Sequence, residues 1–239
     1  MKLMFCRVAG VAVGVVLAGM WLVPSEADAA GYVFDFGHIF SGSTTPAASP
    51  PWIEGIFQDV AGGVQFSITN VGLSTGEFVG ELYFNLNPAY GANGPASLSF
   101  SLQSRGGSFD LPSVSKQANA FKADGDGYFD VMLSFSTSSA SGQHRFVGGD
   151  SLSYLISGLS GLKASDFVFQ SSDSSTGLYA AAHIQGISGG TSIWSNPNQV
   201  LQVTNPVSAP EPGPGGLLVL AASLWAGSRF RPGWTAGRR

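Results

Sequence analysis

Apolar residues recur at every second position through most of the chain, and this period constrains the fold more than any other feature. Residues 64–69 alternate Val, Phe and Ile with Gln, Ser and Thr, as expected of a strand with one buried face. Similar runs occur at residues 32–40, 78–86, 97–102, 129–135, 152–156 and 166–170. No long amphipathic helix competes with these runs, so the sequence predicts an all-β protein.

Dipeptides that contain glycine separate the runs and supply the positive φ angles that tight reversals need. They are Gly62-Gly63, Asn93-Gly94, Gly106-Gly107, Asp126-Gly127, Gly148-Gly149 and Gly189-Gly190. Links this short join antiparallel strands, because a parallel crossover needs about a dozen residues or more. We therefore expect one domain over residues 30–208, an antiparallel β-sandwich of jelly-roll type.

The first 29 residues have the three parts of a secretory signal peptide. Lys2 and Arg7 precede an apolar run at residues 8–23, and Ala27 and Ala29 place small side chains where signal peptidase requires them. We expect an apolar signal helix and cleavage after Ala29; the alternative is a retained membrane anchor. The only cysteine, Cys6, leaves with the signal, so the exported domain has no disulfide.

The charge of the body excludes one class of partner. Residues 30–209 contain five basic and twelve acidic residues, a net charge of −7. Binding to nucleic acid requires a basic patch that this composition does not supply, so we expect no nucleic-acid partner.

The C-terminal residues 209–239 combine three elements in a fixed order. Pro210, Glu211 and Pro212 form a stiff, extended peptide, an apolar stretch follows at residues 217–226, and four arginines follow that stretch. We expect the apolar stretch to form a hydrophobic helix that enters the membrane. This segment resembles the PEP-CTERM sorting domain of exported bacterial proteins. A simple membrane anchor without cleavage is the alternative.

The resemblance to PEP-CTERM proteins implies a destination but no activity. It implies export across the inner membrane of a Gram-negative cell, an inner-membrane intermediate, and processing by an exosortase-type enzyme. It further implies association with the cell surface or with an extracellular polysaccharide matrix. We therefore expect a surface or matrix protein without catalysis and without a cofactor.

Two other functions compete with this interpretation. A carbohydrate-binding module would use aromatic residues near loops, such as Trp52, Tyr90 and Trp194. A hydrolase is suggested by Gly149-Asp150-Ser151-Leu152, which matches the nucleophile block of the GDSL esterases. The block lacks a downstream Asp-x-x-His partner, so a turn that enters a strand explains it better.

One acidic segment could hold a metal ion. Asp124, Asp126 and Asp130 lie within seven residues and could provide the first ligands of a structural calcium ion. The EF-hand spacing does not fit, and the turn chemistry of a hairpin explains Asp and Gly here equally well. The three histidines lie in separate segments, which does not indicate a zinc site.

Overall fold

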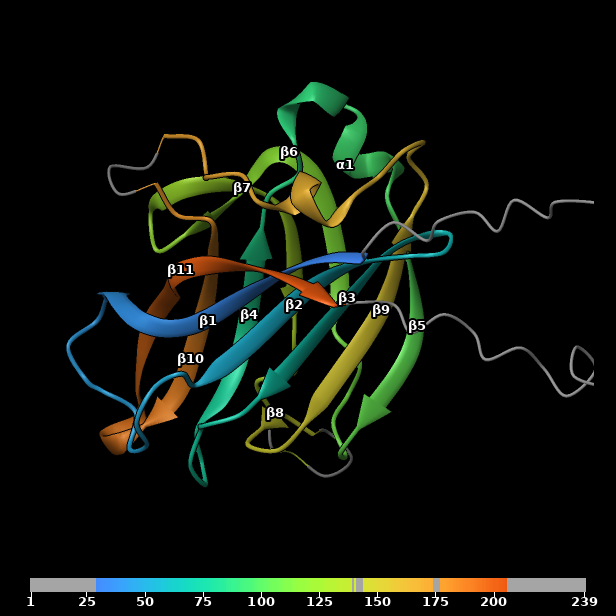
Figure 1. The fold of residues 1–239 in the computed structure, drawn as a ribbon. Helices are drawn as coiled ribbons and strands as arrows, with labels where there is room; N and C mark the ends of the chain where they lie inside the picture. Colours follow the sequence, from blue (N-terminus) through green and yellow to red (C-terminus); the bar gives the residue numbers. More distant parts are fainter. Residues whose placement is uncertain (1–28, 139, 141–143, 174–176, 206–239) are drawn as a thin grey trace, which may run out of the picture.

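The computed structural model describes residues 29–138, 140, 144–173 and 177–205 as a mostly antiparallel β structure (Figure 1). The strands in chain order are β1 (Ala29–Ser41), β2 (Ile53–Val60), β3 (Gly63–Asn70), β4 (Phe78–Phe84), β5 (Ser99–Gly106), β6 (Ser113–Ala123), β7 (Asp126–Ser134), β8 (Phe146–Val147), β9 (Ser151–Ser157), β10 (Ala180–Ile187) and β11 (Thr191–Asn205). The short helices are η1 (Pro88–Tyr90), α1 (Gly94–Ser97), η2 (Ala164–Phe167) and η3 (Ser188–Gly190). In this part of the chain, none of the helices has the length and apolar character needed to span a bilayer.

The strands form one continuous sheet in the order β5-β9-β3-β2-β1-β11-β10-β4-β7-β6, and β8 pairs with β4. The pair β1–β11 lies in the middle, and its register shifts between Phe34 and Phe36, between Phe36 and His38, and between Ile39 and Ser41. Such irregularities bend a strand and increase its twist. The sheet curls, and its two halves face each other as in a sandwich (Figure 1). The all-β, sandwich-like prediction is confirmed, whereas the jelly-roll topology is not.

Phenylalanine rings dominate the core between the two halves. The ring of Phe57 on β2 lies 4.6 Å from that of Phe66 on β3 and 4.5 Å from that of Phe167 on η2. Phe34 on β1 and Phe84 on β4 meet the Phe57 ring at steep angles, with centroids 5.4 and 5.1 Å away. Because Phe57 and Phe84 belong to opposite halves, this ring cluster joins them.

The alternating runs predict most inward faces correctly but not the edge of the sheet. Residues 64–68 and 152–156 form strands as predicted, and their inward side chains Val64, Phe66, Ile68, Leu152, Tyr154 and Ile156 are buried. The run at 97–102 was expected to be half-buried in the same way, but Leu102 on β5 is 45% exposed. β5 ends the strand order and is paired with β9 on one side, so its side chains have fewer neighbours. The strands β2, β6, β8, β10 and β11 were not predicted.

Two local predictions are wrong. The predicted strand at residues 166–170 does not form. Residues 166–167 end η2, because the Asp166 carboxylate accepts the backbone N–H of Lys163 at 2.9 Å and closes a helical turn, and residues 168–170 belong to neither a helix nor a strand. Asn93-Gly94 does not make a tight reversal but leads into α1, in which Pro95 occupies the first turn. The predicted signal residue Ala27, the sorting residues 210–212 and both terminal helices lie outside the described residues.

The ring cluster makes a prediction about stability. Phe57→Ala should lower the free energy of unfolding by about 3–5 kcal/mol, because it removes a buried ring and leaves a cavity among four others. Leu102→Ala on the exposed edge should change it by less than about 0.5 kcal/mol. Urea denaturation followed by tryptophan fluorescence would measure both, and equal losses would contradict this account of the core.

Candidate functional site

The structure uses Asp130, one of the three predicted calcium ligands, to hold the backbone. Asp130 on β7 is 8% exposed, and its two carboxylate oxygens accept the backbone N–H groups of Leu86 at 2.9 Å and Asn119 at 2.8 Å. A buried backbone donor without an acceptor would be costly, so this carboxylate fixes both segments.

The other two aspartates lie at the β6–β7 turn. Asp124 has a φ of 46° and accepts a hydrogen bond from the hydroxyl of Ser41, whereas Asp126 begins β7. Among the described residues, the structure shows no group of three or more His, Cys, Asp or Glu side chains placed to hold a metal ion. The calcium site therefore stays a prediction, and Asp130 would have to serve it in addition to its backbone donors.

The segment that matches the GDSL block is a turn that enters a strand. The carboxylate of Asp150 accepts the N–H of Val147 at 2.8 Å, and Ser151 is the first residue of β9. Asp150 also packs against Gly107, which has a φ of +98° and where a Cβ would lie 1.8 Å from the carboxylate. Glycine is needed there for both reasons. The interpretation of this block as a turn is confirmed.

The three histidines of the chain lie on different elements and contact different partners. Nδ1 of His38 lies 2.8 Å from the amide oxygen of Asn196. The backbone N–H of His144 donates to Asp110. Nδ1 of His183 lies 2.9 Å from the amide nitrogen of Gln185. No hydrogen bond to Ser151 is seen for them in the described part of the chain.

The aromatic residues suggested for carbohydrate stacking serve the scaffold. Trp52 is 2% exposed and donates from its indole nitrogen to the backbone oxygen of Ala48 at 2.8 Å. The hydroxyl of Tyr90 donates to Asp166 at 2.9 Å. Trp194 is half-buried and stacks on His183, with centroids 4.4 Å apart and planes within 4°. Trp52 is thus unsuited to the proposed stacking, because its faces are covered.

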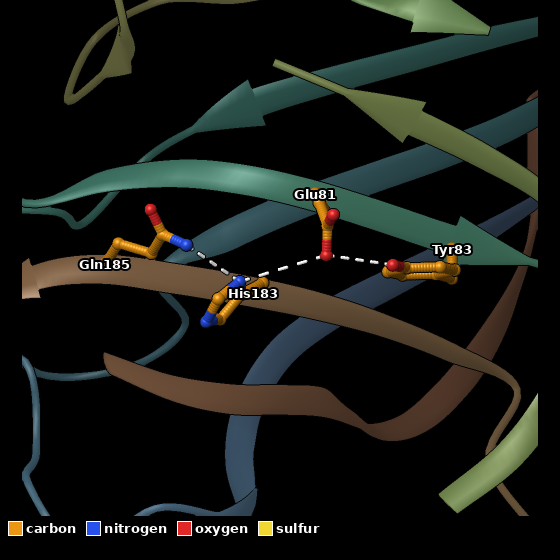
Figure 2. Close-up of polar contacts among 4 residues, drawn as sticks. All are labelled: Glu81, Tyr83, His183 and Gln185. Atoms are coloured by element: carbon orange, nitrogen blue, oxygen red, sulfur yellow. Dashed lines mark hydrogen bonds and ion pairs between the residues drawn. The ribbon is translucent and has the colours of Figure 1, made fainter. Parts of the chain in front are cut away.

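A polar cluster occupies the outer face of β4 and β10 (Figure 2). The hydroxyl of Tyr83 donates to the carboxylate of Glu81 at 2.8 Å, and the same oxygen lies 3.9 Å from Nδ1 of His183. The carboxamide of Gln185 reaches this nitrogen from the other side at 2.9 Å. Because an amide nitrogen can only donate, this contact is a hydrogen bond when Nδ1 carries no proton.

Burial controls the ionisation of this cluster. It lowers the pKa of His183, which Glu81 and Asp124 raise to a smaller extent. His183 is therefore neutral at pH 7, and its approach to Glu81 is not an ion pair at that pH. Burial, together with the hydrogen bond to Glu81, raises the pKa of Tyr83, so this tyrosine remains protonated and cannot act as a base near neutral pH.

Figure 1 shows α1 at one end of the sheet. A second polar site includes Pro95 of this helix in its lining. It is a pocket of about 320 Å³, which we call the amide pocket. Its polar wall consists of Asn85, Asn87, Asn119, Asp130, Gln170 and Ser172, and its apolar wall includes Leu86, Pro88 and Phe169.

Two carboxylates hold the walls of the amide pocket in place. Asp130 joins the segment that follows β4 to the bend of β6, as described above. Asp166 of η2 accepts the side-chain amide of Asn87 and the hydroxyl of Tyr90, both at 2.9 Å. The backbone N–H of Asn87 also donates to the carbonyl of Asp166 at 2.7 Å. The loop that carries η1 is therefore fixed from two sides.

Sequence reasoning missed the amide pocket. Its wall comes from four segments that are up to 87 positions apart, from Asn85 to Ser172. The one local signal is Asn85-Leu86-Asn87 directly after a strand, and this pattern is also typical of an ordinary turn. Comparison with protein-family models, with curated proteins and with solved structures finds no match for this chain.

The backbone role of Asp130 can be separated from a metal-binding role. Asp130→Ala should lower the free energy of unfolding by about 1–3 kcal/mol with or without calcium, because the N–H of Leu86 loses its acceptor. Asp126→Ala should change it by less than about 0.5 kcal/mol. Urea denaturation in EGTA and in calcium chloride measures both. A stabilisation by calcium that either substitution abolishes would instead establish the predicted calcium site.

The lowered pKa of His183 predicts a dependence of stability on pH. Below about pH 6.5 this histidine is protonated in the unfolded chain while it is still neutral in the folded chain. The free energy of unfolding therefore decreases as the pH is lowered, until the folded ring is protonated as well. His183→Gln should flatten this part of the curve. The matched control is His38→Gln, at an exposed position. Urea midpoints between about pH 8 and pH 5 test this, and an unchanged slope in His183→Gln would contradict it.

Proposed function

We propose that this chain is an exported cell-surface or extracellular-matrix protein without catalytic activity. A signal peptide and the PEP-CTERM-like segment with Pro210, Glu211 and Pro212 deliver it. The single observation that carries this proposal is the order of signal, body and sorting segment along the sequence. Its processing partners are signal peptidase and an exosortase-type enzyme, in the inner membrane of a Gram-negative cell.

The arrangement of the domain ends supports this proposal. Ala29 at the start of β1 pairs with Asn205 at the end of β11, so the signal and the sorting segment are attached to adjacent strands. Cleavage after Ala29 would remove one residue of a 13-residue strand and leave the remaining register with β11 intact. When the two ends of a domain lie side by side, the domain can fold while one end is still held in a membrane.

The use of polar groups in the body supports a non-catalytic role. Four buried carboxylates, Glu77, Asp130, Asp150 and Asp166, each accept backbone N–H groups of neighbouring segments. Such groups serve to fix loops. The second candidate function is carbohydrate binding, and the observation that favours it is the amide pocket, whose wall combines carboxamides with an apolar side.

Mass spectrometry of the protein from its native host tests the proposed delivery. The mature chain should begin at Ala30 and should end near Pro212, and the second end should depend on the sorting enzyme. Substituting Pro210 and Pro212 by alanine should leave the C-terminal segment attached, because the stiff, extended peptide is lost. A wild-type chain that retains Arg239 in the presence of the enzyme would contradict the processing, and a chain found in the cytosol would contradict the export.

A further inference from the structure

We propose that the amide pocket binds a neutral, hydroxyl-rich ligand, of the size of one sugar ring or a comparable polyol. This inference rests on the second candidate function and gives it a site and a ligand class. The volume of about 320 Å³ is at the small end of the range for ligand pockets, which suits a single ring.

The polar wall matches the hydrogen-bonding character of hydroxyl groups. A sugar hydroxyl both donates and accepts, and a carboxamide offers donors and an acceptor within one side chain. Three asparagines and one glutamine line the pocket, together with the hydroxyl of Ser172. Asn85 is 3% exposed and donates to the carbonyl of Phe169, and the carboxamide of Asn87 bonds Asp166 and the backbone of Ala89. The exposed groups that can contact hydroxyls of a ring are therefore Asn119, Gln170 and Ser172, which come from two separate segments.

The charge of the wall disfavours an anionic ligand. Its residues include no lysine, arginine or histidine, and the only ionisable side chain among them is Asp130. The Asp130 carboxylate already receives one backbone N–H on each oxygen. Each carboxylate oxygen has a second lone pair, which can accept a hydrogen bond from a neutral hydroxyl. An acidic sugar would place a second negative charge beside this group without a compensating cation.

The apolar wall provides the other half of the complementarity. Pro88 is exposed and Phe169 is half-buried, and these two side chains form its accessible part, whereas Leu86 is buried in the core behind them. One side of a sugar ring presents C–H groups, which pack against such surfaces while the hydroxyls at its edge remain bonded. A bare cation would make no use of this wall, and one carboxylate is a weak ligand set for calcium.

The pocket is largely formed before a ligand arrives, which reduces the entropy lost on binding. Asp130 and Asp166 fix the loop that follows β4, as shown above. Asn119 has a φ of 49°, and its amide oxygen accepts the hydroxyl of Ser172 at 2.6 Å, so its side chain has one defined direction. Asn119 and Gln170 are exposed and form part of the rim.

Titration calorimetry with the full-length protein tests the site. The protein is kept in lauryldimethylamine oxide, because detergents with maltose or glucose head groups would compete. The probes are the methyl glycosides of glucose, galactose and mannose, with glucuronate and calcium chloride as charged comparisons. We expect saturable binding of at least one neutral glycoside and weaker or no binding of glucuronate. Gln170→Ala combined with Asn119→Gly, which suits the positive φ, should weaken it about tenfold or more.

The matched control is Gln103→Ala, which removes an exposed carboxamide from β5 and should leave binding unchanged. Absence of binding by every neutral glycoside would overturn the proposal, as would binding that the rim substitutions do not weaken. Glucuronate binding as tight as that of the neutral glycosides would overturn the ligand class. Calcium binding that depends on Asn119 would show that the pocket is a cation site and not a site for a neutral ligand. None of these outcomes affects the mature termini, so the proposed delivery is tested independently.

Discussion

The pairing of β1 with β11 is the constraint on which the rest of the structure depends. These strands come from the two ends of the domain and join the two halves of the sheet. Their register shifts bend the sheet at this position, so that Phe57 and Phe84 can meet from opposite halves. The pairing of β1 with β11 is a non-local contact, because it brings residues 29 and 205 together. The ring cluster stabilises the closed form by removing apolar surface from water.

The sequence predicted the elements whose burial follows from their own pattern and missed those that depend on distant partners. Residues 64–68 alternate strictly and are buried accordingly. The run that ends at Leu102 shows the same alternation, but its exposure depends on β5 having no strand on its outer side in the sheet order. The run at residues 166–170 predicted a strand, whereas the carboxylate of Asp166 closes a turn of helix. Alternation of apolar and polar residues indicates a strand with two different faces. It does not indicate whether that strand lies at the edge or in the middle of the sheet.

Acidic residues of this domain serve as acceptors for the backbone, which explains part of its negative charge without a metal or a basic partner. Asp130, Asp150 and Asp166 each hold a connection between strands. In a domain without disulfides, such carboxylates supply fixed points between distant segments. The sequence could show that Asp130 was acidic and near a turn. It could not show that Leu86 and Asn119 would provide its two donors, because their proximity is a product of the fold.

The amide pocket and the attachment of the chain ends use different parts of this scaffold. The pocket wall comes from the segments after β4, in β6 and β7, and before β10, and it includes no residue of β1 or β11. The segments that we propose as signal and sorting segment, in contrast, precede β1 and follow β11, whose ends Ala29 and Asn205 are paired. The proposed ligand site and the proposed attachment through the C-terminal segment therefore depend on different residues of the scaffold. Because β1 and β11 also join the two halves, a loss of their pairing would disturb the core, whereas a change at Asn119 or Gln170 would not.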